Sequence, residues 1–119
     1  MISKEFETLI LFNGEIFNHI ELRKDLERKG IAFNSDHSDT ETALLGLSYY
    51  GVDYVNKFIG QFSIFFYNSR NNTGYLLRDR LGQKPLYYNV SKDGVKFSSN
   101  FLSLYKNLSI KTINQNSIN

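Results

Sequence analysis

Three residues that could do chemistry, Asn13, Gly14 and Glu15, follow directly after the apolar run at residues 9–12. The Asn13 side chain offers an NH2 donor, and Gly14 leaves a backbone N–H open to close approach. Two converging donors of this kind can hold an oxyanion that develops during a reaction. The Glu15 carboxylate could hold a cationic group such as an α-ammonium. A structural interpretation also stands, because Asn-Gly is a favoured turn dipeptide.

A further carboxylate, Asp39, lies in the motif S-D-T-E at residues 38–41. Ser38 and Glu41 have the spacing of a helix capping box, which predicts a helix from residue 40 to about residue 50. Asp39 would then fall in the first turn, where free backbone N–H groups stabilise a carboxylate by ~0.3–1 kcal/mol. That is the structural interpretation. The functional one is that a carboxylate held rigidly at a helix start suits a ligand ammonium.

The strand that carries the first three candidates is predicted from hydrophobicity alone. The continuous apolar run at 9–12 is typical of a strand that is buried on both faces. We expect a first strand over residues 6–12 that closes at Asn13, Gly14 and Glu15. Residues 1–5 are expected to fray.

The remaining pattern predicts helices first and hairpins afterwards. Asn18 is the expected N-cap of a first helix, Glu21 completes a capping box, and Gly30 is its stop. Further expected elements are a helical segment over 52–58, strands over 61–67 and 75–78, a hairpin that pairs 89–90 with 95–99, and a short helix over 101–106. This order indicates an α+β fold with a mostly antiparallel sheet.

The charged segment R-D-R-L-G-Q-K-P-L-Y-Y, residues 78–88, places three bases and an acid around a glycine. These charges could form a buried ion-pair network or a partner surface. We interpret them as fixing the loop, since paired charges more often shape a turn than take part in chemistry.

Length and composition limit the number of domains and the kinds of partner that we expect. The 119 residues, 41% of them hydrophobic, suffice for one domain with one core. The net charge of +2 comes from mixed charges without a basic stripe, which speaks against nucleic-acid binding. There is no membrane-spanning apolar run and no secretory signal, so we expect a cytoplasmic protein without a membrane partner.

Cysteine and histidine usage narrows the chemistry further. The sequence contains no cysteine, which excludes disulfides, thiolate metal sites and a cysteine nucleophile within these residues. His19 and His37 lack metal-ligand spacing. We therefore expect no metal site.

Four motifs occur together in one order. They are F-N-G-E-I-F-N at 12–18, E-L-R-K-D-L at 21–26, S-D-T-E at 38–41, and the charged segment at 78–88. Over residues 9–104 the chain resembles the glutaminase domain of class II glutamine amidotransferases, most closely the asparagine synthetase type. The resemblance implies an N-terminal-nucleophile hydrolase fold, in which two antiparallel sheets lie between flanking helices.

The resemblance also implies an activity. In the family an N-terminal cysteine attacks the side-chain amide of glutamine and releases ammonia. A second domain, which uses ATP and Mg²⁺, then forms an amide on an acceptor such as aspartate. No cofactor is implied for the present chain.

Site roles follow from matching the motifs residue by residue. Asn13 and Gly14 match the oxyanion-hole pair. Gly14 and Glu15 match positions that line the glutamine pocket. Asp39 matches the carboxylate that takes the glutamine α-ammonium, so these four residues form the expected glutamine site.

The chain departs from the family at both ends. It begins Met1-Ile2-Ser3 where the family begins Met-Cys-Gly, so we expect the family's first strands, the nucleophile and the arginine that grips the glutamine carboxylate to be missing. We expect residues 1–106 to form a partial amidotransferase domain and residues 107–119 to resemble the start of a synthetase domain.

Two functions remain open on this basis. The first is the glutaminase portion of an asparagine synthetase-like enzyme, inactive alone for want of the nucleophile. It would pair with itself or with a chain that supplies the missing strands or the synthetase domain. The second is a non-catalytic module that binds glutamine or another protein. A truncated product without a role is a third reading.

Overall fold

The computed structural model describes residues 1–108. The chain divides into two compact units, Met1–Lys84 and Pro85–Asn119. Of the predicted synthetase-like tail, residues 109–119 lie outside the described residues.

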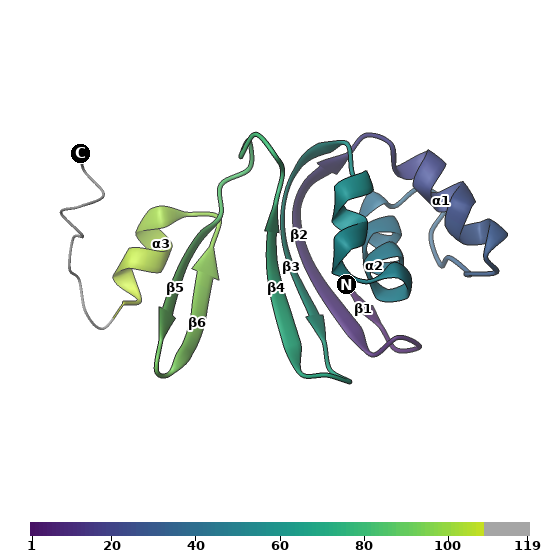
Figure 1. Ribbon diagram of the computed structural model, residues 1–119. Coiled ribbons are helices and arrows are strands. Elements are labelled where there is room, and N and C mark those ends of the chain that lie inside the picture. The colour runs from purple at the N-terminus through teal and green to yellow at the C-terminus, as the bar shows by residue number, and fades with distance from the viewer. Residues whose placement is uncertain (109–119) are drawn as a thin grey trace. The chain divides into compact units, whose positions relative to one another are not determined.

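The first unit is a four-stranded antiparallel sheet with helices on one side (Figure 1). In chain order its elements are β1 (Ile2–Ser3), β2 (Thr8–Ile16), α1 (His19–Arg28), α2 (Asp39–Tyr50), the 3₁₀ helix η1 (Val52–Lys57), β3 (Gly60–Asn68) and β4 (Thr73–Arg78). The strands follow the order β1-β2-β3-β4. The expected fraying at the N-terminus is wrong for Ile2 and Ser3, because both pair with β2.

The core lies between the sheet and the helices. Every second residue of β2 faces α2, and Ile10 and Ile16 are completely buried there. The same cluster includes Ala43, Leu44 and Leu47 of α2, Tyr54 of η1, and Phe62, Ile64 and Phe66 of β3. Each of the Ile, Leu and Phe side chains in this cluster contributes about 1.5–3 kcal/mol through its burial.

The other face of the sheet, which we call the open face, carries no helix of this unit (Figure 1). The register places Leu9 opposite Tyr67 and Leu11 opposite Phe65 on this face. Leu11 is 51% exposed, so the prediction of a strand buried on both faces is wrong for these residues. The apolar run is continuous because both faces are apolar, although helices cover only one of them.

Asn18 is at the predicted N-cap position of α1, but its side chain does not make the predicted capping hydrogen bond. Instead its amide donates to the Lys57 carbonyl at 2.9 Å, and its side-chain oxygen accepts from the Ile59 N–H at 2.9 Å. Asn18 therefore joins the start of α1 to the end of η1. Gly30 follows the helix with φ +85°, as its role as a stop requires.

Helix α2 begins and ends where the sequence predicts. The Ser38 side chain accepts from the Glu41 N–H at 3.1 Å, which confirms the cap. Gly51, at φ +88°, ends the helix.

The hairpins are also confirmed. In the second unit, β5 (Tyr87–Ser91) pairs with β6 (Gly94–Ser98), and α3 (Phe101–Lys106) follows. The Asn100 side chain caps α3 by accepting from the Ser103 N–H at 3.0 Å.

Candidate functional site

The motif Asn13-Gly14-Glu15 is extended strand, and the expectation that the strand closes there is wrong. β2 runs through all three residues to Ile16, and each one pairs with β3. The continuous pairing with β3 overrides the turn preference of the Asn-Gly dipeptide. The structure therefore removes the turn interpretation of this motif.

Asn13 and Glu15 belong to the open face. They share the parity of Leu11 along β2, and Asn13 lies opposite Ser63 in the register. Both side chains are exposed. The side-chain amide and the carboxylate therefore lie on the open face, two residues apart on one strand.

The backbone N–H of Gly14 points toward the edge of β2 that faces away from β3, which we call the outer edge. On this edge Ile10 donates its N–H to the Met1 carbonyl at 2.9 Å, and Ile16 donates its N–H to Asp39 Oδ2 at 3.0 Å. Successive N–H groups of a strand alternate between its edges, so Gly14, between these two residues and of the same parity, points the same way.

Asp39 thus reaches the outer edge from the start of α2. It is half-buried, and its Oδ1 accepts a 3.3 Å hydrogen bond from the Thr40 hydroxyl. The Ile16 N–H and the Gly14 N–H are two strand residues apart, a span of about 7 Å. The structure therefore brings Gly14 and Asp39, which are 25 positions apart in the sequence, to one edge of one strand.

Gly14 has a packing role that sequence reasoning missed. A Cβ on Gly14 would lie 2.1 Å from the Gln61 carbonyl oxygen and 2.6 Å from the Phe62 Cα, and its φ is +148°. Any side chain here would force β2 and β3 apart. The absence of a side chain at Gly14 is therefore required by the close pairing of β2 with β3.

Glu41 was also missed as a site element, since its spacing from Ser38 indicated only a capping box. The Glu41 side chain, 4% exposed, accepts from the backbone N–H groups of Asn34 at 2.7 Å and Ser35 at 2.9 Å, and from the Ser35 hydroxyl. Burial raises the pKa of Glu41, but the Ser35 and Asn34 hydrogen bonds outweigh it and hold the pKa below its usual value. Glu41 fixes the loop that leads into α2 and hence the position of Asp39.

The charged segment fixes its own loop, as predicted. The buried Asp79 carboxylate accepts from the backbone N–H groups of Phe62 at 3.2 Å, Gln83 at 2.8 Å and Lys84 at 3.0 Å. Arg78 donates to the carbonyls of Lys84 and Gly82. The charges of Asp79 and Arg78 are therefore satisfied by backbone groups of the loop and of β3.

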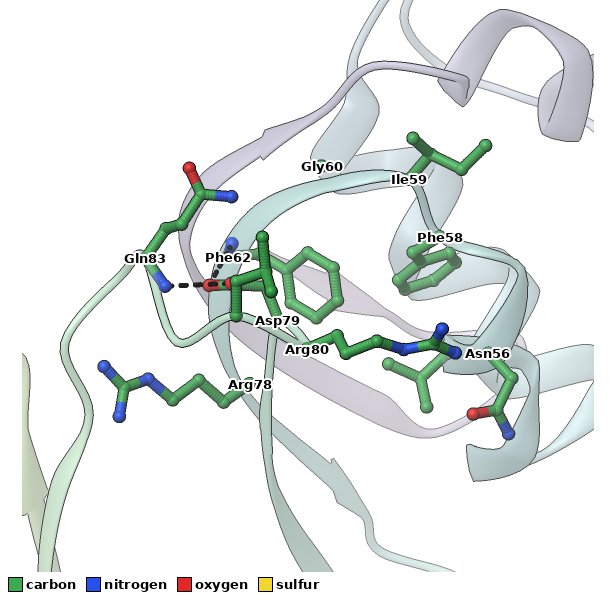
Figure 2. A pocket seen from close by; sticks show the side chains of 11 residues that line it. Asn56, Phe58, Ile59, Gly60, Phe62, Arg78, Asp79, Arg80 and Gln83 are labelled. Carbon is green, nitrogen blue, oxygen red and sulfur yellow. Dashed lines mark hydrogen bonds between the residues drawn. The ribbon is translucent and has the colours of Figure 1, made fainter.

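A cavity of about 660 Å³ adjoins this loop, and none of the four predicted site residues lines it (Figure 2). It lies between residues 55–60 and the loop at 78–83. The predicted residues instead lie on the open face (Asn13 and Glu15) and at the outer edge of β2 (Gly14 and Asp39). Within residues 1–108, no group of three or more His, Cys, Asp or Glu side chains has a geometry for a metal ion. In the same residues, no helix is long and apolar enough to cross a membrane.

Comparisons with known proteins identify the same family as the sequence motifs. The family model described as a glutamine amidotransferase domain matches residues 1–119. The chain is 45% identical over 104 residues to asparagine synthetase [glutamine-hydrolyzing] 1 of Bacillus subtilis (strain 168), a match that covers 87% of this chain and 16% of that protein. It is 41% identical over 97 residues to a probable asparagine synthetase [glutamine-hydrolyzing] of Dictyostelium discoideum, covering 80% of this chain and 17% of that protein.

A solved structure shows the fold. The glutamine phosphoribosylpyrophosphate amidotransferase from B. subtilis, complexed with ADP and GMP, matches with a TM-score of 0.66 and 19% identity, over 83% of this chain and 23% of that chain. This likeness confirms the predicted α+β fold of the N-terminal-nucleophile hydrolase type. The chain spans about a sixth of the length of the two curated relatives.

Proposed function

The chain belongs to the glutamine amidotransferase domain family, and on that premise we propose that its first unit forms the amide-recognition part of a glutamine-hydrolysing site in an asparagine synthetase-like enzyme. The observation that supports this proposal is the placement of the Gly14 N–H and the Asp39 carboxylate on the outer edge of β2. An amide donor and an ammonium acceptor on one edge match the two ends of a glutamine molecule.

The dimensions of glutamine suit this edge. Four covalent bonds of about 1.5 Å separate its amide carbon from its α-nitrogen, an extended distance of about 5 Å. The two positions on β2 are about 7 Å apart. Glutamine can therefore lie along the strand, with its amide oxygen at Gly14 and its α-ammonium beside the Asp39 carboxylate.

The proposed chemistry is addition to the amide carbon. As a nucleophile adds, the amide oxygen gains negative charge, which the Gly14 N–H and the Asn13 side-chain NH2 stabilise. One such donor is typically worth about 10²–10³ in kcat. The carbon–nitrogen bond then breaks, and the amide nitrogen takes up the proton that the nucleophile gave up and leaves as ammonia. The acyl group stays on the nucleophile until water adds to it and releases glutamate. Because these 119 residues contain no cysteine, a thiol nucleophile would have to come from outside them.

A second function is favoured by that same composition. Without a sulfur nucleophile in these residues, the strand edge can serve as a glutamine-binding module that performs no hydrolysis. The two functions share the contacts at Gly14 and Asp39 and differ only in turnover.

A chimeric enzyme, which we call the graft, distinguishes the two functions. The matched 104 residues of the B. subtilis asparagine synthetase 1 would be replaced by those of this chain, and glutaminase activity would be measured as ammonia released from glutamine. We expect the graft to hydrolyse glutamine. Asn13→Ala in the graft should lower kcat about 10²–10³-fold. Asp39→Asn should raise KM at least about tenfold, because a charge-assisted contact is lost. Asp36→Asn, an exposed carboxylate in the preceding loop, is the matched control and should change neither constant.

Asparagine synthesis from free ammonia does not require glutamine hydrolysis. It therefore reports whether the graft has folded. A graft that makes asparagine from ammonia but binds and hydrolyses no glutamine would refute the proposed site. Glutamine binding without hydrolysis would favour the module.

A further inference from the structure

The cavity beside the charged loop is a candidate site separate from the edge of β2. It lies within the first unit, between the end of η1 and the loop at residues 78–83, with a volume of about 660 Å³ (Figure 2). Cavities of about 300–1,000 Å³ are typical of binding sites in proteins.

Polar and apolar side chains line the cavity in about equal measure, and its rim exposes large aliphatic side chains. Val55, Phe58 and Phe62 line the interior. Ile59 is 63% exposed and Leu81 is 81% exposed, one on each of the two segments that enclose the cavity. Exposed aliphatic side chains on both sides of a hollow are suited to flanking apolar groups of a bound segment.

The free charge in the cavity is positive. Asp79 is committed to three backbone N–H groups, and Arg78 donates to two backbone carbonyls. Arg80, which is exposed, has no hydrogen bond or ion pair with any residue in the described part of the chain. In Figure 2 the Arg80 side chain extends toward Asn56, while Arg78 points the other way. The cavity therefore presents one uncommitted guanidinium beside the apolar side chains of Phe58 and Phe62.

The segment that carries Arg80 is held in place before any ligand binds. Asp79 ties this loop to β3 through the Phe62 N–H, and Gly82 completes the turn at φ +65°. A preformed wall lowers the ordering cost of binding.

We propose that this cavity is a docking site for an Asp or Glu side chain that has aliphatic neighbours in another polypeptide segment. The carboxylate pairs with the Arg80 guanidinium, which can bind it in a bidentate manner. The aliphatic neighbours contact Ile59 and Leu81. Charge complementarity selects a carboxylate over a cation, and the two apolar rims select a peptide over a free small anion.

The test uses the ¹⁵N-labelled 119-residue chain and two blocked peptides, acetyl-Leu-Glu-Leu-amide and its isostere acetyl-Leu-Gln-Leu-amide. Amide shifts are followed at millimolar peptide. We expect the signals of Ile59 and Leu81 to shift with the Glu peptide, which should bind about tenfold more tightly than the Gln peptide, a difference of one charge-assisted contact. Arg80→Glu should abolish this preference. Lys24→Glu, the same charge reversal at an exposed position on α1, should leave it intact.

Arg80→Gln provides a second variant without charge reversal and should reduce the preference to less than about twofold. Equal affinity for the two peptides would overturn the proposal. So would an absence of shifts at Ile59 and Leu81, or a preference that survives both Arg80 variants. Acetate alone should bind at least about tenfold more weakly than the Glu peptide, since it cannot contact the aliphatic rims. These readouts do not involve glutamine, so this proposal and the proposed function can fail independently.

Discussion

Asp79→Ala should be among the most damaging single substitutions in the first unit. The Asp79 carboxylate is 5% exposed and accepts from the N–H groups of Phe62, Gln83 and Lys84. Removing it leaves the Phe62 N–H unpaired inside the sheet, which costs about 1–3 kcal/mol. The two loop amides can be rehydrated and should cost about 0.5–1 kcal/mol each. We expect a total loss of about 2–5 kcal/mol in the free energy of unfolding, or about 8–40 °C in Tm for a unit of this size.

Urea unfolding followed by far-UV circular dichroism measures this loss. Asp79→Asn keeps one acceptor oxygen and should show an intermediate loss. Asp36→Ala removes an exposed carboxylate and should change stability by less than about 0.5 kcal/mol. If Asp79→Ala is as mild as that control, Asp79 does not anchor the loop to the sheet.

The remaining predictions concern pH and the two faces of the sheet. Burial raises the pKa values of Asp79 and Glu41, but hydrogen bonds outweigh it and lower both, so the folded state holds fewer protons than the unfolded state in acid. Stability should be constant above about pH 5 and fall below about pH 4, and urea midpoints that stay constant down to pH 3 would contradict this. Ile10→Ala should cost about 2–5 kcal/mol because Ile10 is completely buried, whereas the adjacent Leu11→Lys should cost less than about 1 kcal/mol. Leu11→Lys should also reduce any self-association in size-exclusion chromatography. An equal loss of stability from Ile10→Ala and Leu11→Lys would contradict the placement of Leu11 on an uncovered face.

Helix boundaries were predictable because their signals are local. Ser38 caps α2 through its side chain, and Gly51 adopts the positive φ that ends α2. Each of these effects depends on the few residues next to it. Asn18 shows the limit, since its side chain bonds to Lys57 and Ile59 across the fold instead of capping α1.

The length of β2 was not predictable from local signals. Asn13-Gly14 favours a turn in isolation, but nine consecutive residues of β2 pair with β3, from Thr8 opposite Asn68 to Ile16 opposite Gly60. That pairing joins residues up to 60 positions apart, so no local pattern reports it.

The residue types of the candidate site come from the motif match and stay a prediction, and the sequence indicated its geometry only in part. The motif match named Gly14 and Asp39, and the Ile16–Asp39 hydrogen bond explains how they reach one edge. Glu41 was assigned to a capping box, because a spacing of three residues cannot distinguish a cap from a loop clamp. The cavity at Arg80 combines two segments about 20 residues apart and has no sequence signature.

Titration of the ¹⁵N-labelled chain with glutamine tests the central claim most directly. The amide signals of Gly14 and Ile16 should shift as glutamine binds along the outer edge of β2, and Asp39→Asn should weaken the binding at least about tenfold. Signals at Gly14 and Ile16 that do not move at saturating glutamine, or that move equally in Asp39→Asn, would contradict it.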